Sequence, residues 1–270
     1  MADRAAIVTG ASSGIGLAIA RVLGQEGYGL TLAARRPDKL SQAALALRDE
    51  GFEVVDVAAN MASEEEIKEV VGAHRERFGR LDVLVNNAGV GHGAAVTEVP
   101  TKKIDMQIDV NLRSVILFYR ECADMLRAAG AEHHNALVVK TASIAGKSPQ
   151  AWLAVYSATK AGVIAYTQAM NRELKSDGVK SVALCPGFVA TPMTDFMREQ
   201  IKAEEMIQPT DIAGAVRWLL TLSQACVVPE IVFQRPSEVR LVLRAHVQYL
   251  FACTQALLQP NQLQLTSPPI

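Results

Sequence analysis

Residues 9–16 read "TGASSGIG", and the context of this stretch decides the fold. The run before it, "AAIVTG" (5–10), is apolar throughout, as in a buried strand, and "GLAIARVLGQEG" (16–27) after it has helical spacing. A strand, a glycine-rich turn and a helix start together present free N–H groups and a positive dipole end to a phosphate. The spacing is G-x-x-x-G-x-G rather than the more familiar G-x-G-x-x-G. We predict that this turn binds a dinucleotide through Gly10, Ser12, Ser13, Gly14, Ile15 and Gly16.

Short apolar runs alternate with longer stretches of helical spacing up to residue 233. This alternation predicts βαβ units and a parallel sheet. The runs are continuously apolar, as expected where helices cover both faces of the sheet. We predict an α/β fold, a doubly wound Rossmann-type sandwich. Its strands are expected at 5–10, 29–34, 52–57, 81–86, 136–143, 179–185 and 227–233, and helices include 16–27, 63–79 and 210–222.

The end of the chain has a different composition. From 237 to 270 there is no glycine, and the only charged residues are Glu238, Arg240 and Arg244. Polar residues recur with a spacing that suits a helix with a narrow polar stripe, and the segment after Pro260 reads as irregular. We predict a catalytic domain at 1–236 and an extension at 237–270 that is helical or partly disordered. It packs on the domain, joins subunits or is poorly ordered.

The composition excludes several classes of protein. The 270 residues carry 27 Lys and Arg against 28 Asp and Glu, a net charge of −1, so no basic footprint for nucleic acid is expected. No signal peptide and no membrane span are recognisable, which predicts a cytoplasmic protein. The four cysteines have no metal-ligand spacing, and no metal is predicted; they are Cys122, Cys185, Cys226 and Cys253.

The end of the second predicted strand indicates which dinucleotide is bound. An NAD site places a carboxylate there for the ribose 2′-hydroxyl, whereas this chain has Arg35 and Arg36 after Ala34. A pair of guanidinium groups suits a 2′-phosphate, so we predict NADP(H), with a solvated basic loop as the alternative. Asp56, near the end of the third strand, is predicted either to bond the adenine or to be a turn residue.

Several motifs occur in an order that resembles the short-chain dehydrogenase/reductase family. They are "TGASSGIG" (9–16), "NNAG" (86–89), Asn111, Ser143, "YSATK" (156–160) and "PG" (186–187), and the resemblance covers about 1–233. It implies a seven-stranded parallel sheet and a nicotinamide cofactor used on alcohols and carbonyls. The chain departs from the family after its last strand, where "VVPEIVFQRP" replaces a glycine-rich end that often joins subunits.

The resemblance also implies roles for individual residues. The catalytic residues would be Asn111, Ser143, Tyr156 and Lys160. Lys160 would in addition bond the ribose hydroxyls, and Asn111 would hold a water that connects Lys160 to solvent. Further cofactor contacts would come from Asn87, Ala88, Gly89, Tyr156, Pro186, Gly187, Val189 and Thr191.

The chemistry of the pair Tyr156 and Lys160 follows from their spacing. Residues four apart share a helix face, so the ammonium lies near the phenol. A nearby cation favours the phenolate, and we predict that it lowers the pKa of Tyr156, by about three units with the help of an oxidised nicotinamide. Ser143 is expected to donate a hydrogen bond to the substrate oxygen.

Other candidates are weaker. His92 is a possible substrate contact, whereas His133 and His134 are expected to be exposed without partners. Segment 187–207 is predicted to be a lid whose apolar side chains, with Trp152, line the pocket or simply pack in the core. Three tyrosines without a matched lysine are expected to be packing residues: Tyr28, Tyr119 and Tyr166.

Together these features predict an NADP(H)-dependent oxidoreductase that interconverts a carbonyl and a secondary alcohol, with reduction favoured. Its substrate is expected to be a small, largely apolar molecule. Small residues in 157–170 permit close packing between subunits, so a homodimer or homotetramer is predicted. The alternatives are a non-catalytic dinucleotide-binding regulatory or assembly subunit, and an NAD-dependent dehydrogenase of the same family.

Overall fold

The computed structural model describes residues 3–238. In this range one parallel sheet has seven strands in the order β3-β2-β1-β4-β5-β6-β7. All seven predicted strands are present, and their ends differ from the predicted ones by at most three residues. The strands are β1 (Arg4–Thr9), β2 (Tyr28–Ala34), β3 (Val54–Ala58), β4 (Val83–Asn86), β5 (Ala136–Thr141), β6 (Val179–Pro186) and β7 (Glu230–Phe233).

The strand order reverses next to β1, which pairs with β2 on one side and β4 on the other. Ile7 is opposite Thr31 in β2 and opposite Leu84 in β4. In open α/β sheets a ligand binds beyond the carboxyl ends of the strands at this reversal. The glycine-rich turn follows β1 and "NNAG" includes the end of β4, so both motifs lie at this point.

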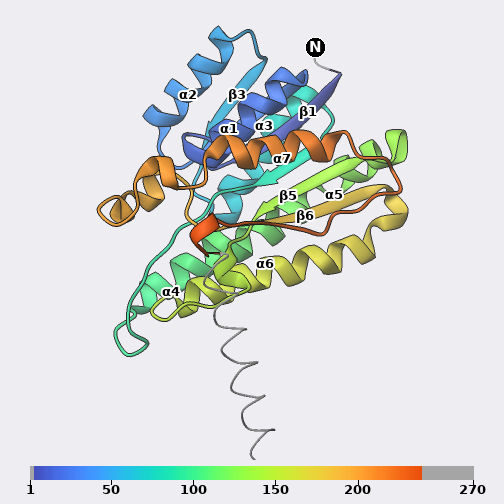
Figure 1. The fold of residues 1–270 in the computed structure, drawn as a ribbon. Helices are drawn as coiled ribbons and strands as arrows, with labels where there is room; N and C mark the ends of the chain where they lie inside the picture. Colours follow the sequence, from blue (N-terminus) through green and yellow to red (C-terminus); the bar gives the residue numbers. More distant parts are fainter. Residues whose placement is uncertain (1–2, 239–270) are drawn as a thin grey trace, which may run out of the picture. The chain divides into compact units, whose positions relative to one another are not determined.

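Helices cover both faces of the sheet (Figure 1). One apolar core unites α1, α2 and α7 with one face, and a second unites α3 and α5 with the other. The α-helices are α1 (Gly14–Gln25), α2 (Pro37–Asp49), α3 (Glu64–Phe78), α4 (Thr101–Ile108), α5 (Ser114–His133), α6 (Ala154–Glu173) and α7 (Pro209–Leu220). A π-helical segment spans Asp109–Arg113, and short 3₁₀ turns lie at Ile144–Gly146, Lys175–Asp177, Pro192–Met197 and Ala203–Glu205.

Local signals explain where α3 begins and ends. Its N-cap Ser63 accepts a hydrogen bond from the backbone N–H of Glu66, and acidic residues fill the first turn. Gly79 ends the helix with φ +67°, a left-handed conformation that glycine adopts readily. The sequence predicted a helix at 63–79, which differs from the observed one only by its two capping residues.

A compact unit ends at Phe233, and a second unit begins at Gln234. Except for its first two residues, the extension predicted at 237–270 lies outside the described residues, so its helix and the division into 1–236 and 237–270 stay predictions. Among the described helices, none has the length and apolar character needed to cross a membrane.

Candidate functional site

The turn between β1 and α1 is built around glycines. Gly10 and Gly14 have φ angles of +65° and +57°, in the left-handed region that favours glycine. A Cβ at Gly16 would overlap the carbonyl oxygen of Gly10. The N-cap residue Ser13 makes no capping hydrogen bond with its side chain. The first N–H groups of α1 therefore face an anion-binding position without a side-chain cap.

The segment after β6 lies against this turn. A Cβ at Gly14 would lie 2.9 Å from the methyl carbon of Thr191, so the two segments touch. Val189 is buried and forms a β-bridge with Ile207, and the N–H of Gly187 donates to the carbonyl of Phe233 at 2.9 Å. The structure thus brings together two predicted sets of cofactor residues, 10–16 and 186–191. Ser12 and Ile15 are half-buried in the same turn.

Arg35 and Arg36 follow β2 at the carboxyl edge of the sheet. Both are exposed, and Arg36 is the N-cap residue of α2. Ala34 is the last residue of β2 and pairs with Ala58 in β3. Within the described chain neither arginine has an ion pair, whereas many other arginines do. The two guanidinium groups can therefore receive an anion near the glycine turn.

The prediction that Asp56 lies at the end of β3 is wrong, because the strand continues to Ala58. Its carboxylate pairs with Arg48 of α2 at 2.5 Å. Beyond the strand, the N–H of Ala59 extends the pairing to the carbonyl of Ala34 at 3.0 Å, and the exposed Asn60 follows. Asn60 therefore holds the edge position that the sequence analysis assigned to Asp56.

Asn87 ties the ends of three strands together. Its N–H and that of Ala88 both donate to Oγ1 of Thr9 at 3.0 Å, and its Nδ2 donates to the carbonyl of Thr9 at 3.2 Å. The hydroxyl of Thr141 donates to Oδ1 of Asn87 at 3.0 Å. These bonds fix β1, β4 and β5 relative to one another at the carboxyl edge.

Asn111 lies in the π-helical segment, a type of insertion that is frequent at functional sites. Its side chain exchanges two hydrogen bonds with the backbone of Val90, at 2.8 and 2.9 Å, and donates to Thr159 Oγ1 at 3.2 Å. A Cβ at Gly89 would lie 3.4 Å from both Asn111 Oδ1 and Lys160 Nζ. The motif "NNAG", Asn111 and Lys160 therefore lie next to one another.

Tyr156 and Lys160 lie one turn apart on α6. The Nζ of Lys160 is 5.6 Å from the centre of the Tyr156 ring and donates to the carbonyl of Thr141 at 2.7 Å. Ser143 follows β5 and forms a hydrogen bond with Tyr156. All four predicted catalytic residues are thus gathered at the carboxyl edge of β4 and β5.

Burial dominates the electrostatics of this pair. It raises the pKa of Tyr156 above its ordinary value, against a smaller lowering by the Ser143 hydrogen bond. Burial also lowers the pKa of Lys160 to about 8. The predicted lowering of the Tyr156 pKa is therefore wrong for the chain by itself, because burial outweighs the effect that lowers it. A neutral tyrosine results, which suits a proton donor.

The predicted lid does not present one apolar inner face. Met206 is buried, Met193 is half exposed and Phe196 is 73% exposed. Trp152 is also 73% exposed, so it is not a core residue.

The N–H of His92 donates to Oε1 of the buried Gln107 at 3.1 Å, which fixes the backbone of the loop after β4.

Tyr119 and Tyr166 have no lysine four residues further on and pack against the core, as predicted, but a lysine from another element lies beside both rings. Lys140 of β5 is completely buried, with its Nζ 4.8 Å from the Tyr119 ring centre and 5.8 Å from that of Tyr166. Its Nζ and the Nδ2 of neighbouring Asn86 have no hydrogen-bond partner among the described residues. Burial lowers the pKa of Lys140 to about 7. Tyr28 packs as predicted, and its hydroxyl accepts from Arg4 at 3.1 Å.

The prediction that His133 has no partner is wrong. Its Nε2 is 2.8 Å from the buried carboxylate of Asp82, which also accepts from Arg80 and from the N–H of Ala5. Hydrogen bonds with Arg80 and His133 hold the pKa of Asp82 below its usual range, although burial alone would raise it. This network lies at the amino ends of β1 and β4, away from the candidate site. His134 caps α5 in a left-handed conformation.

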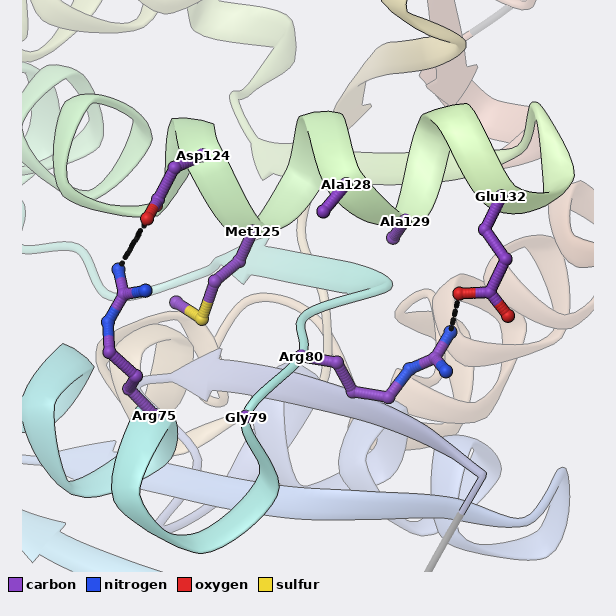
Figure 2. Close-up of a pocket in the computed structure, with 8 residues that line it drawn as sticks. All are labelled: Arg75, Gly79, Arg80, Asp124, Met125, Ala128, Ala129 and Glu132. Atoms are coloured by element: carbon purple, nitrogen blue, oxygen red, sulfur yellow. Dashed lines mark hydrogen bonds and ion pairs between the residues drawn. The ribbon is translucent and has the colours of Figure 1, made fainter.

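Figure 2 shows a separate hollow of about 340 Å³ between the end of α3 and α5. Arg75 pairs with Asp124 across it at 2.9 Å, and Arg80 pairs with Glu132 at 3.2 Å. Met125 lies between these two bridges. Because both arginines are already paired, this hollow presents no unpaired arginine to a ligand. It lies at the opposite edge of the sheet from Tyr156. Within residues 3–238 no His, Cys, Asp and Glu cluster suits a metal.

Comparison with known proteins identifies relatives over most of the chain. The family model described as short chain dehydrogenase matches residues 4–202. The chain is 36% identical over 245 residues to a granaticin polyketide synthase putative ketoacyl reductase of Streptomyces violaceoruber. This match covers 83% of the chain and 89% of the relative.

Two solved structures extend the likeness to three dimensions. One is an actinorhodin polyketide ketoreductase with NADPH, with a TM-score of 0.77, 34% identity, and coverage of 86% of this chain and 97% of that one. The other is a 3-ketoacyl-(acyl-carrier-protein) reductase from Brucella melitensis complexed with NADH, with a TM-score of 0.77, 28% identity, and coverage of 86% and 96%.

Proposed function

The chain belongs to the short-chain dehydrogenase family, and from this premise we propose that it is an NADP(H)-dependent oxidoreductase. It interconverts a carbonyl and a secondary alcohol, with reduction favoured. The observation that carries the proposal is the grouping of Asn111, Ser143, Tyr156 and Lys160 at one edge of the sheet, beside the glycine turn. The relatives named as ketoacyl reductases and the neighbour solved with NADPH support it.

The residues present fit a dinucleotide. The left-handed turn at Gly10 and Gly14, with no room for a Cβ at Gly16, leaves the backbone open to a pyrophosphate at the start of α1. Asn87 to Gly89 and Pro186 to Thr191 line the same edge, and Lys160 is placed to bond the ribose. Asn60, two residues beyond the end of β3, is nearer than Asp56 to the edge where the adenine would lie.

The preference for NADP(H) rests on Arg35 and Arg36. These exposed guanidinium groups stand where an NAD site places a carboxylate. A charge-assisted bond to a 2′-phosphate contributes roughly 1.5–3 kcal/mol, which corresponds to about 10–100-fold in affinity. The structural neighbours include one with NADPH and one with NADH, so the arginines carry this choice.

The protein's own part in the reaction is the transfer and orientation of a proton. Bound nicotinamide supplies or accepts the hydride. Tyr156, neutral because burial raises its pKa, donates its hydroxyl proton to the carbonyl oxygen as charge develops there. Ser143 donates a second hydrogen bond to that oxygen. Lys160, with a pKa of about 8, is largely charged at pH 7 and stabilises the phenolate that remains.

The substrate is proposed to be a small, largely apolar carbonyl compound. Exposed apolar side chains at Met193 and Phe196 in the predicted lid support this class. We place the enzyme in a homodimer or homotetramer, because the small residues of α6, from Ser157 to Met170, permit close approach of another subunit.

The decisive experiment measures NADPH oxidation against a panel of ketones with wild type, Tyr156→Phe and Tyr166→Phe. Loss of the proton donor is expected to reduce kcat about 10²–10⁴-fold. Tyr166→Phe is the matched control, because it removes a hydroxyl from the same helix outside the site. If wild type reduces no carbonyl, the chain is a dinucleotide-binding subunit without this chemistry. If Tyr156→Phe keeps full turnover, Tyr156 is not the proton donor.

A second measurement tests the cofactor. Arg35→Ala is expected to weaken NADPH binding about 10–100-fold and to leave NADH binding nearly unchanged. Arg21→Ala is the control, because this exposed arginine of α1 pairs with Glu50 instead. An equal preference for the two dinucleotides in wild type and Arg35→Ala would instead identify an NAD-dependent enzyme or a solvated basic loop.

A further inference from the structure

Trp152 has an unusual backbone conformation. Among the described residues other than glycine, only His134 and Trp152 have positive φ angles, +52° and +69°. His134 is the C-cap of α5, where a left-handed residue is common, and its N–H donates to the carbonyl of Gly130. Trp152 caps no helix end. For a bulky side chain this region is a genuine outlier, and such strain persists where the surroundings impose it, often at functional sites.

Neighbouring backbone holds Trp152 in this conformation. The N–H of Ala94 donates to the carbonyl of Trp152 at 2.8 Å, and the N–H of Leu153 donates to that of Gln150 at 3.2 Å. A Cβ at Gly93 would lie 3.3 Å from the Trp152 carbonyl oxygen and from the Leu153 side chain. The loop after β4 and the segment before α6 are therefore clamped together at this residue.

The ring of Trp152 gains little from folding. It is 73% exposed, although tryptophan is among the side chains with most apolar surface to bury. Strain in the backbone and exposure of the ring both disfavour this arrangement in the free protein. Core packing thus does not explain why the ring is held outwards.

The position of Trp152 connects it to the site. Tyr156 follows four residues later, on the first turn of α6. The loop that clamps Trp152 also lies over the phenol, since a Cβ at Gly91 would be 3.9 Å from the Tyr156 ring. One loop, residues 91–94, thus contacts both the ring of the proton donor and the backbone that carries the exposed ring.

We infer that Trp152 determines substrate specificity: its ring packs on an aromatic or polycyclic group that the substrate carries beyond the carbonyl. This inference rests on the proposed function. The substrates selected would be ketones with a flat apolar group, because an aromatic ring packs on such a group better than on a short alkyl chain. The clamped backbone fixes the direction in which the side chain leaves the chain before binding, so less backbone freedom is lost when the substrate arrives.

The kinetic test compares 2-acetonaphthone with 2-butanone for wild type, Trp152→Ala, Trp152→Gly and Trp152→Phe. Loss of the ring is expected to raise KM for 2-acetonaphthone roughly 10–100-fold, with Trp152→Phe restoring most of the affinity. The kinetics with 2-butanone should stay within about twofold. Equal effects on both ketones, or no effect on either, would overturn the inference while leaving the proposed function intact.

The stability of the variants supplies a readout that a structural role would not give. Trp152→Gly relieves the left-handed strain, so its Tm should exceed that of Trp152→Ala by about 2–4 °C while its KM for 2-acetonaphthone is equally poor. The matched control is His134→Gly against His134→Ala, which should show the same order in Tm and no change in KM. A Trp152→Gly protein less stable than Trp152→Ala would contradict the role assigned to strain.

Fluorescence separates this inference from the proposed function. The chain has two tryptophans, Trp152 and Trp218, so Trp218→Phe leaves only Trp152. In a background of Tyr156→Phe, 2-acetonaphthone with NADPH should quench this emission saturably. A Trp152→Phe protein that keeps Trp218 should show no saturable quenching. Quenching without turnover in wild type would refute the reductase and keep the binding role. Turnover without selective quenching would refute the binding role of Trp152 and keep the reductase.

Discussion

Replacement of Lys140 by Met tests the energetics of the fold most directly. The Nζ of Lys140 is buried between β5 and two tyrosine rings and has no hydrogen-bond partner among the described residues. Burial lowers its pKa from 10.5 to about 7. Methionine has a similar length and no charge, so it keeps most of the packing and removes the buried amine.

The magnitude follows from the pKa values. The difference between 10.5 and about 7 corresponds to about 5 kcal/mol at 1.36 kcal/mol for each pH unit. Contact with two aromatic faces offsets roughly 1–2 kcal/mol of this for the charged form. Lys140→Met should therefore stabilise the protein at pH 7 by about 3–4 kcal/mol.

The sign of the pH dependence is fixed by which state binds more protons. Between pH 7 and pH 10.5 the unfolded chain keeps the proton on Lys140 more readily than the folded one, so the free energy of unfolding rises with pH in this window. Below it both states are protonated, and above it neither is. The rise from pH 7 to pH 9 should be about 1–3 kcal/mol larger in wild type than in Lys140→Met.

Urea unfolding at pH 7 and pH 9 measures these quantities. The control is Lys102→Met, which changes an exposed lysine of α4 and should leave the wild-type pH dependence in place. Equal slopes in wild type and Lys140→Met would refute the reasoning. So would a Lys140→Met protein that is less stable at pH 7, because the two rings would then compensate the burial completely.

Three further outcomes are expected. Gly16→Ala places a methyl group on the carbonyl oxygen of Gly10 and should weaken NADPH binding about 10–100-fold in a direct titration, whereas Gly72→Ala, which meets open space, should not. Asp82→Asn breaks a buried ion pair and should cost about 3–5 kcal/mol in urea unfolding at pH 7. In wild type this contribution should fade as pH falls below 3.8, because the folded pKa is lowered. His74, with its pKa lowered from 6.5 to about 4 by burial, stays neutral in the fold. Stability should therefore fall by about 3 kcal/mol between pH 6.5 and pH 4, and His74→Gln should flatten that part of the curve.

The sequence predicts the sheet well because its signals are local. Each strand is a mostly apolar run, and each end is marked by glycine, proline or a polar residue within a few positions. Gly10, Asn87 and Ser143 follow or end separate strands, and parallel strands bring their carboxyl ends to one edge. The grouping of the candidate residues therefore follows from topology.

What the sequence does not predict depends on contacts between distant residues. Asp82 and His133 are 51 positions apart, and nothing local marks either as the other's partner. The predicted position of Asp56 is wrong for a different reason, because β3 ends two residues beyond Asp56, at Ala58, and a different side chain lies at the edge. The left-handed backbone of Trp152 also leaves no mark in the sequence, since it arises from the clamp made by Ala94.

Lys140 and Lys160, two of the buried lysines, show why residue types alone do not define the site. Lys140 lies beside Tyr119 and Tyr166, so it repeats the pairing of a lysine with a tyrosine found at Lys160. Burial lowers the pKa of Lys160 to about 8 and that of Lys140 to about 7, and Lys160 donates to a backbone carbonyl whereas Lys140 has no hydrogen-bond partner among the described residues. Lys140 lies within the helix–sheet core, whereas Lys160 reaches the carboxyl edge where Gly89 and Asn111 meet. Position relative to the strand ends therefore separates a group that can meet a substrate from one that influences only stability.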